Sequence, residues 1–416
     1  MTIERFSRLE VAYAAEGGLG GLGGLGGLGG LGGLGGLGGL GGLGGLGGLG
    51  GLGGLGGLAA PADTPLLAEA LIRTRDAIAG TWQPVGTPAP ERGTENVANL
   101  TLWAPAVRAS LFDFELHSRL AFSAQATAQN GDPRAMSIWH LARTSADDAT
   151  PPVVEHRKLA QLVRPPEATL RAQLVIVDDY AGLRPDRSAE VLAQTGTVVP
   201  FLGALANLHG ERTSWTLELL ATAFRLAQFV HFRVKHALAC RRPIEFSPQI
   251  QPIIQTPAHG SLPSGHATEA FAMAFVLLAV VRDGGNAIYA QPGWAEQLMR
   301  LAARIAINRT IGGVHFPADS VAGAMLGLTL GRYLVARSTT TGTASGWSFD
   351  GTAYPADLDF EWSALVDVAQ VPPAQLAAGN HVGPIPVNVG DPALIGDGDR
   401  SLVLRELWDK ALAEWS

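Results

Sequence analysis

The sequence has a single cysteine, Cys240, among 416 residues, so no intrachain disulfide can form and cysteine usage leaves the compartment open. Charge is also sparse: only 16% of the residues are Asp, Glu, Lys or Arg, and the formal net charge is −7. A nucleic-acid-binding protein normally shows the opposite balance, with a dominant basic face. We therefore expect no nucleic-acid partner.

The chain also lacks a long uninterrupted apolar run of the kind that crosses a bilayer, which needs about 20 mostly apolar residues. The best candidates, residues 267–281 and 321–334, are short and are interrupted by Glu269 and Arg332. The first sixteen residues do not show the charged-then-apolar pattern of a secretory signal peptide. These absences predict a soluble protein without a transmembrane span, in the cytoplasm rather than secreted.

One low-complexity segment stands out, because the triplet Gly-Gly-Leu repeats fourteen times without a break from Gly17 to Leu58. A helix is disfavoured there, since each Gly costs about 1 kcal/mol relative to Ala. Collagen is disfavoured by the absence of proline. Two alternatives stay open: a flexible tail with no bearing on chemistry, or a tether that associates through an edge of aligned Leu side chains.

Beyond this tail the apolar residues recur mainly at helical spacing, which predicts a mostly helical protein. We expect helices over these ranges: residues 65–78, 105–129, parts of 136–163, 167–194, 213–240, 264–281, 294–308, 317–335 and 402–415. The predicted organisation is a tail at 1–58, an N-terminal helical part at 59–200, a helical bundle carrying the chemistry at 201–337, and a loop-rich extension at 338–416.

Three blocks of polar residues within the predicted bundle suggest a binding site for an oxyanion. Lys235 and Arg242 are seven residues apart, so on one helix both would leave the same face. Arg matches the geometry of phosphate-like oxyanions and Lys acts as a mobile point charge. Alone, such a pair is more often a solvated helix face than a site.

The second block, Pro263-Ser264-Gly265-His266, opens a helix with Ser264 as its N-cap. A helix N-terminus offers unpaired N–H groups and a positive dipole end to an anion. Gly265 would let that anion approach the backbone closely. An ordinary capped helix start would look the same, so this block gains weight only beside the others.

The third block joins Arg309, across the Gly312-Gly313 turn, to His315 and Asp319. His315 and Asp319 are four residues apart at a helix start, so the carboxylate can reach the imidazole and fix its tautomer. The other ring nitrogen would then be free as a nucleophile or ligand. Together the blocks offer three cations, two imidazoles, a carboxylate and a hydroxyl, a set suited to a compact tetrahedral oxyanion.

Lys235-x6-Arg242-Pro243, Pro263-Ser264-Gly265-His266 and Arg309-x5-His315-x3-Asp319 resemble the motifs of the type 2 phosphatidic acid phosphatase and vanadium haloperoxidase superfamily. The resemblance covers about a fifth of the chain and implies an all-α fold with a helical-bundle core. It implies that five residues bind the oxyanion: Lys235, Arg242, Ser264, Gly265 and Arg309. It also assigns three catalytic residues: His315 as phosphate nucleophile or axial vanadium ligand, His266 as acid and base, and Asp319 as the group orienting His315.

Two positions depart from the family pattern and another favours one branch of it. Asn308 replaces the common Ser before the second Arg, and Phe316 replaces the Trp that follows the histidine in haloperoxidases. Residues 313–319 look more like the phosphatase branch. Against this, His259 lies seven residues before His266, where vanadium bromoperoxidases carry an extra histidine on the halide and peroxide side. A loop histidine without function would occupy His259 equally well.

We therefore expect a vanadate-dependent haloperoxidase that oxidises halide with hydrogen peroxide. The alternatives are a soluble acid phosphatase, which would hydrolyse a phosphomonoester through a phosphohistidine without a cofactor, and a non-catalytic oxyanion-binding scaffold that uses the Gly-Gly-Leu tail for interaction. A homo-oligomer stays open, although no interface pattern is visible.

Overall fold

The structure is a computed structural model. It describes residues 65–80, 93, 95–126, 133–143, 153–339, 343–368, 385–395 and 397–416. The Gly-Gly-Leu repeat of residues 17–58 and the proline-rich connector near Trp82 lie outside these residues. The helix expected over residues 65–78 is α5 (Pro65–Ile78), none of whose residues is buried.

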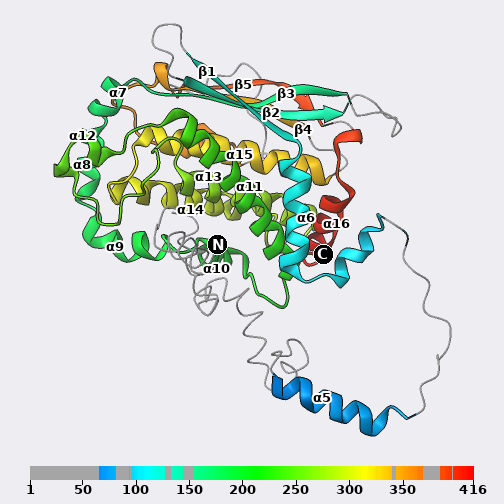
Figure 1. Ribbon diagram of the computed structural model, residues 1–416. Helices are drawn as coiled ribbons and strands as arrows, with labels where there is room; N and C mark the ends of the chain where they lie inside the picture. Colours follow the sequence, from blue (N-terminus) through cyan, green and yellow to red (C-terminus); the bar gives the residue numbers. More distant parts are fainter. Residues whose placement is uncertain are drawn as a thin grey trace, which may run out of the picture.

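The chemistry-bearing part of the chain forms four long helices: α11 (Ser214–Leu238), α13 (Gly265–Asp283), α14 (Pro292–Ile311) and α15 (Pro317–Ser338). Shorter helices surround them (Figure 1): α6 (Pro105–His117), α7 (Glu167–Ala172), α8 (Leu174–Ala181), α9 (Arg184–Ala193), α10 (Val199–Ala206), α12 (Pro243–Phe246) and α16 (Leu402–Leu412). Short 3-10 helices occur at Val97–Leu102, Pro248–Ile250, Gly351–Ala353, Trp362–Ala364 and Asp397–Asp399. The fold is thus mostly helical, as predicted.

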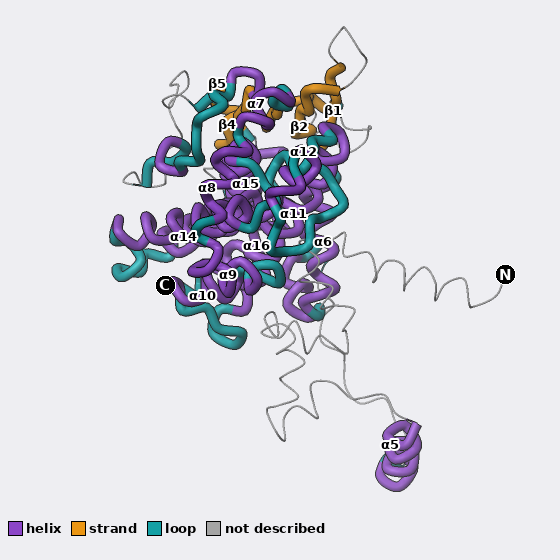
Figure 2. The backbone as a smooth tube through the Cα atoms, turned by 90° about the vertical axis from the view of Figure 1, so that its left-hand side faces the viewer, coloured by secondary structure: helices purple, strands orange, loops and turns teal. Residues whose placement is uncertain are grey.

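A five-stranded sheet covers one side of the helices, with the order β1-β2-β3-β4-β5. Its strands are β1 (Leu120–Ala126), β2 (Pro133–Arg143), β3 (Val154–Val163), β4 (Thr343–Asp350) and β5 (Val387–Leu394). All neighbours are antiparallel except β3 and β4, which are parallel, with Ala160 opposite Trp347. Figure 2 shows the strands gathered at one end of the molecule, over the helices.

The sheet corrects three expectations about secondary structure. Residues 105–129 were expected to be one helix, but α6 ends at His117 and β1 follows. Apart from Val153, the described residues between 136 and 163, parts of which were expected to be helical, belong to strands β2 and β3. From Ile138 to Arg143 buried residues alternate with less buried ones, the period of a strand with one covered face. The C-terminal region, expected to be loops and one final helix, also supplies β4 and β5. The domain boundaries at residues 200 and 337 stay predictions.

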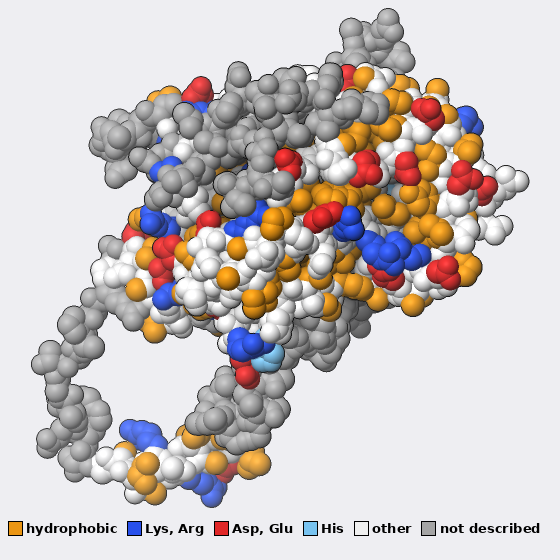
Figure 3. Space-filling model, turned by 180° about the vertical axis from the view of Figure 1, so that it is seen from behind, with side chains coloured by type: hydrophobic (Ala, Val, Ile, Leu, Met, Phe, Trp, Pro, Cys, Tyr) orange, Lys and Arg blue, Asp and Glu red, His pale blue; other side chains and the backbone are white. Residues whose placement is uncertain are grey.

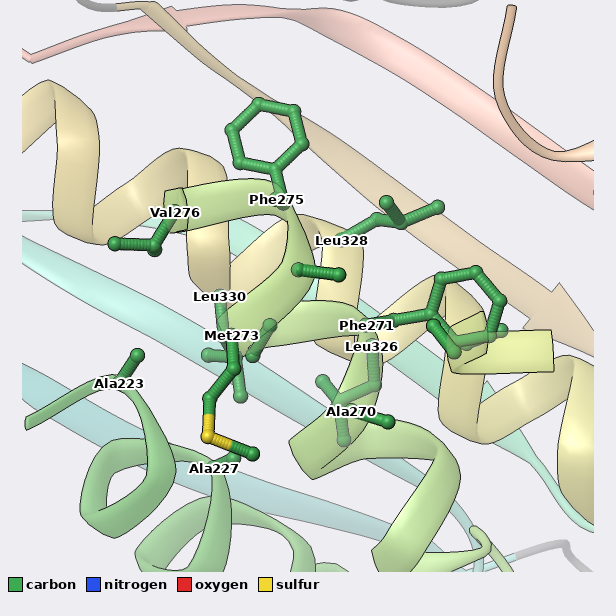
Figure 4. Close-up of a cluster of buried hydrophobic side chains, with 14 of the residues drawn as sticks. Ala223, Ala227, Ala270, Phe271, Met273, Phe275, Val276, Leu326, Leu328 and Leu330 are labelled. Atoms are coloured by element: carbon green, nitrogen blue, oxygen red, sulfur yellow. The ribbon is translucent and has the colours of Figure 1, made fainter. Parts of the chain in front are cut away.

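The centre of the bundle is α13, which packs along α15 and is almost wholly buried (Figure 4). Three glycines of α15 make this close packing feasible: Gly323, Gly327 and Gly331. A Cβ on Gly327 would overlap the carbonyl oxygen of Thr268. Of the described helices, α13 alone is long and apolar enough to cross a membrane. Of its most apolar 18-residue stretch, 89% is buried inside the protein. Its apolarity is accounted for by its central position.

The outer surface carries charges of both signs. Figure 3 shows Lys and Arg side chains interspersed with Asp and Glu on the face opposite that of Figure 1. In contrast, several cationic side chains are almost completely buried among the helices, including Lys235, Arg242 and Arg309 at 1%, 2% and 1% exposure. Buried cations need compensating partners, which a bound anion can supply. These three side chains therefore mark the candidate site.

The ends of α11 are set differently from the expectation. Thr213 occupies its N-cap position, but its hydroxyl bonds to the backbone of His209 and makes no capping hydrogen bond to the helix. The cap comes instead from Glu414, whose carboxylate accepts from the backbone N–H groups of Trp215 and Thr216, both at 2.8 Å. At the other end the helix stops at Leu238, because Ala239 adopts a left-handed conformation with φ of 45°. It therefore ends two residues before Cys240, the expected last residue.

We expect Gly327→Ala to destabilise the protein by about 1–3 kcal/mol, because the added methyl group must separate α15 from α13. Thermal denaturation measures the loss. Gly293→Ala, in the first turn of α14, is the matched control, because a Cβ there meets nothing within 4 Å. Equal melting temperatures for the two variants would contradict the close helix contact.

Candidate functional site

A cavity of about 450 Å³ lies where α11, α13, α14 and the loop after α12 meet. Seven of the nine residues predicted from the sequence line it: Lys235, Arg242, His259, Gly265, His266, Arg309 and His315. The other two do not line it: Asp319 bonds to His315, which does, and Ser264 directly precedes Gly265 in the chain. The three blocks, which span about 85 positions of the chain, therefore converge in space.

Lys235 and Arg242 approach the cavity by different routes, which corrects the expectation that both project from one helix. Lys235 belongs to the last turn of α11, whereas Arg242 follows the left-handed residue Ala239 and is the N-cap residue of α12. Lys235 Nζ donates to the carbonyls of Gly260 and Ser261 at 3.1 and 2.9 Å. The loop that carries these carbonyls thereby fixes the ammonium group at the cavity.

Arg242 is held by backbone carbonyls and two imidazoles. Its Nε donates to the carbonyl of His259 (3.0 Å) and its Nη1 to that of Val314 (2.8 Å). Its other bonds reach His315 Nε2 at 3.0 Å, His259 Nδ1 at 3.1 Å and the Gly260 carbonyl at 3.3 Å. Among the described residues no carboxylate forms an ion pair with this guanidinium, so an anion in the cavity would find it already oriented.

His315 and Asp319 form the pair that their spacing predicted. His315 Nδ1 lies 3.0 Å from Asp319 Oδ2, which also accepts from the backbone N–H of Phe316 at 3.0 Å. Because the carboxylate accepts at Nδ1, the lone pair of His315 is on Nε2, directed at Arg242 Nη1. Burial first, and then the Arg242 and Lys235 charges, hold the pKa of His315 well below its usual value. His315 is thus neutral, with the lone pair of Nε2 at the cavity.

Arg309 has the least satisfied side chain of the site. Its Nη2 donates to the Val191 carbonyl at 2.9 Å and to Gln194 Oε1 at 3.1 Å. Its Nε and Nη1 are buried and have no hydrogen-bond partner among the described residues. A buried unsatisfied donor costs about 1–3 kcal/mol, and more when charged. Two such donors on one cavity-lining guanidinium indicate that a guest with acceptor oxygens belongs there.

The start of α13 forms another part of the wall. Ser264 caps the helix as predicted, since its Oγ accepts from the Ala267 N–H at 3.4 Å, and its own N–H donates to the Asp319 carbonyl at 2.9 Å. A Cβ on Gly265 would lie 3.2 Å from Cε1 of His231. The direction in which Gly265 lacks a side chain is therefore filled by an imidazole, whereas we expected it to face the anion.

His266 and His259 complete the lining with neutral imidazoles. His266 Nε2 donates to the Gln194 carbonyl at 3.0 Å, which leaves the Nδ1 lone pair free to take a proton. Burial, followed by the Arg309 charge, lowers the pKa of His266 to about 4. Burial and the Lys235 and Arg242 charges lower that of His259 to about 3. His259 is half-buried and meets the Phe232 ring edge-on at 5.3 Å.

Five polar residues of the site were missed in the sequence: Thr195 and Gln255, which line the cavity, and the three that follow. His231 and Glu269 line the cavity, and Gln194 binds both Arg309 and His266. A signal for two of them was present: His231 is one helical turn before Lys235, and Glu269 is three residues after His266. Gln194 gave no signal, because it reaches the site from α9, more than a hundred residues from Arg309.

The replacement of the family Ser by Asn308 is accommodated through the same glutamine. Asn308 Nδ2 donates to Gln194 Oε1 at 2.9 Å, and Arg187 Nε donates to Asn308 Oδ1 at 3.1 Å. Asn308 therefore ties α14 to α9 behind Arg309. Phe316, where haloperoxidases have Trp, packs edge-on against Phe246 at 5.8 Å in a small apolar cluster outside the cavity.

The combined electrostatics favour an anion over a metal cation. Burial, followed by Arg242, holds the pKa of Lys235 well below its usual value, and burial lowers those of Arg242 and Arg309 to about 10. Each of these shifts reflects charge taken from water without full compensation. A tetrahedral oxyanion would restore the compensation. Vanadate and phosphate both fit this donor set: fixed cationic donors beside one free imidazole nitrogen.

Comparison with known proteins agrees with this geometry. Residues 216–341, which contain all three blocks, match the model of the PAP2 superfamily. A vanadium-dependent bromoperoxidase from Ascophyllum nodosum is 31% identical over 94 residues, which is 18% of this chain and 17% of that protein. The chain thus carries a PAP2 superfamily domain, and the segment shared with the bromoperoxidase is short.

Three neutral histidines, one buried and two partly buried, predict that the protein without bound anion loses stability in acid. The pKa values of His266, His259 and His140 lie at about 4, 3 and 4 in the fold, below the ordinary value of 6.5. Their contributions are complete above pH 6.5 and are lost as the pH falls toward 4. Asp319 opposes them, because burial raises its pKa to about 6 and the fold therefore gains stability as Asp319 is protonated.

We expect His266→Asn to reduce the stability lost between pH 7 and pH 4.5 by about 1–2 kcal/mol. Thermal denaturation at the two pH values measures this difference. His156→Asn, at an exposed position, is the control and should keep the wild-type loss. An unchanged loss in His266→Asn would show that His266 is not held neutral.

Proposed function

Because residues 216–341 form a domain of the PAP2 superfamily, whose members are typically phosphatases or haloperoxidases, we propose that the cavity is an active site acting on a tetrahedral oxyanion. The first candidate is a vanadate-dependent haloperoxidase that oxidises halide with hydrogen peroxide. The observation that carries the proposal is the state of Arg309: a buried guanidinium lining the cavity, with two donor nitrogens lacking acceptors among the described residues.

Vanadate would be held by groups already in position. Lys235, Arg242 and Arg309 would donate to its oxygens, and His315 Nε2 would supply the ligand nitrogen once the guest displaces the Arg242 hydrogen bond. Vanadate bound in such a site makes hydrogen peroxide electrophilic enough for attack by halide. Asp319, through Nδ1, keeps the Nε2 lone pair of His315 facing the guest.

The residues around the guest have separate tasks in this reaction. His266, neutral and with Nδ1 free, takes the proton of incoming peroxide. Lys235, fixed by two carbonyls, places positive charge beside the oxygen that halide attacks. His259 and Phe232 line the same cavity and give the halide side one polar and one apolar wall. The presence of His259 in the cavity favours this candidate.

A second candidate is hydrolysis of a phosphomonoester by the same groups, and the His315–Asp319 pair favours it. His315 Nε2 would attack phosphorus while a protonated His266 gives its proton to the leaving alkoxide, and water would then hydrolyse the phosphohistidine. His266 is neutral without a guest. A bound phosphate dianion would raise its pKa and thereby prepare it as the acid.

One pair of assays separates the candidates. We expect protein loaded with orthovanadate to brominate a phenol in the presence of hydrogen peroxide and bromide. Hydrolysis of p-nitrophenyl phosphate, inhibited by vanadate and without bromination, would instead establish the phosphatase. Failure of both assays, with tight vanadate binding retained, would leave the oxyanion-binding scaffold.

His315→Ala should lower whichever activity is found by at least about a thousandfold, because it removes the nucleophile or ligand nitrogen itself. The matched control is His140→Ala, since His140 is equally buried but lies under the sheet, against Tyr333 and Asp399. If His315→Ala were as active as the control, per folded molecule, His315 would have no part in the mechanism.

A further inference from the structure

A second histidine–carboxylate pair lies in the cavity wall and has no part in the function proposed above. His231 of α11 and Glu269 of α13 line the cavity at 2% and 3% exposure. His231 Nε2 lies 3.1 Å from Glu269 Oε1, and Gln228 Nε2 donates to the same oxygen at 3.4 Å. Within the described part of the chain, the other carboxylate oxygen, Oε2, accepts no hydrogen bond.

The protonation of this pair follows from its surroundings. Burial raises the pKa of Glu269, but hydrogen bonds from His231 and Gln228 stabilise the carboxylate, and the pKa lies below its usual value. Burial lowers the pKa of His231. At neutral pH the pair is therefore an ionised Glu269 and a neutral His231 whose Nε2–H donates to it. Nδ1 of His231 is buried and has no partner among the described residues.

Glu269 is a negative group in a cavity whose other charged groups are cations. Four groups interact electrostatically with its carboxylate. They are His231 and Lys235 on α11, His266 on its own helix and Arg309 on α14. A deprotonated oxygen of a guest is repelled by this carboxylate, whereas an O–H group donates to it. The pair therefore affects which oxyanions the cavity accepts.

We propose that Glu269 is a specificity-determining residue that accepts a hydrogen bond from a protonated oxygen of the bound oxyanion, and that His231 and Gln228 hold its carboxylate in place. The ligand class is a tetrahedral oxyanion carrying at least one O–H group, such as hydrogen phosphate or hydrogen vanadate. The inference rests on the proposed function only in needing an oxyanion in the cavity, and it holds for either reaction.

Sulfate is the discriminating probe, because it has nearly the size and shape of phosphate but carries no proton at neutral pH. A cavity that requires an O–H donor rejects sulfate, since the carboxylate then faces an unprotonated oxygen. We expect isothermal titration calorimetry at pH 7 to show wild-type protein binding orthophosphate at least about tenfold more tightly than sulfate.

Glu269→Gln supplies the second measurement, because its amide has nearly the same shape, carries no charge and can donate to an unprotonated oxygen. The variant should bind phosphate more weakly and sulfate more strongly, so that the tenfold preference is lost or reversed. Asp399→Asn is the matched control: it removes the carboxylate of another buried histidine pair, with His140, away from the cavity. It should keep the wild-type preference.

Two results would overturn the inference: equal affinities of wild-type protein for phosphate and sulfate, or an unchanged preference in folded Glu269→Gln. The wild-type comparison is decisive even if the variant does not fold. Absence of binding by phosphate, sulfate and vanadate alike would instead refute the proposed function, since the cavity would then accept no oxyanion.

Discussion

The site depends on one buried carboxylate, that of Asp319, because segments from three parts of the chain bond to this residue. Its side chain accepts from His315 Nδ1, from the Phe316 N–H and from Ser261 Oγ at 3.3 Å, and its carbonyl accepts from the Ser264 N–H. The entry to α15, the loop under Lys235 and the start of α13 are thereby placed around a single residue. Asp319 is fully buried, so these contacts are not weakened by competition with water.

The protein places three cations in its interior with little internal compensation, and this arrangement links fold to function. Lys235, Arg242 and Arg309 are bonded mainly to backbone carbonyls and neutral side chains, not to carboxylates. Carbonyls orient a cation but do not neutralise it, so the fold retains a field that attracts anions. The large apolar core around α13 stabilises the fold enough to offset the unfavourable free energy of burying these cations.

Local features of the site were predictable from the sequence and features set by tertiary contacts were not. The His315–Asp319 bond and the Ser264 cap follow from spacings of four and three residues, which any helix start would produce. The route of Arg242 depends on the left-handed conformation of Ala239, an alanine that gives no signal of it. The Glu414 cap on α11 joins positions about two hundred residues apart, beyond the reach of local patterns. Similarly, β2 was read as helix because its apolar residues allow both periods, and pairing with β1 and β3 decided the outcome.

The parallel pairing of β3 with β4 has a consequence for synthesis of the chain. β3 ends at Val163 and β4 begins at Thr343, with the whole PAP2 segment up to α15 between them. While a ribosome makes these residues, the edge of β3 that will receive β4 has no partner, and an open edge can pair with a strand of another nascent chain. Aggregation during synthesis is therefore expected to begin at this edge of β3, in the interval before β4 has been made.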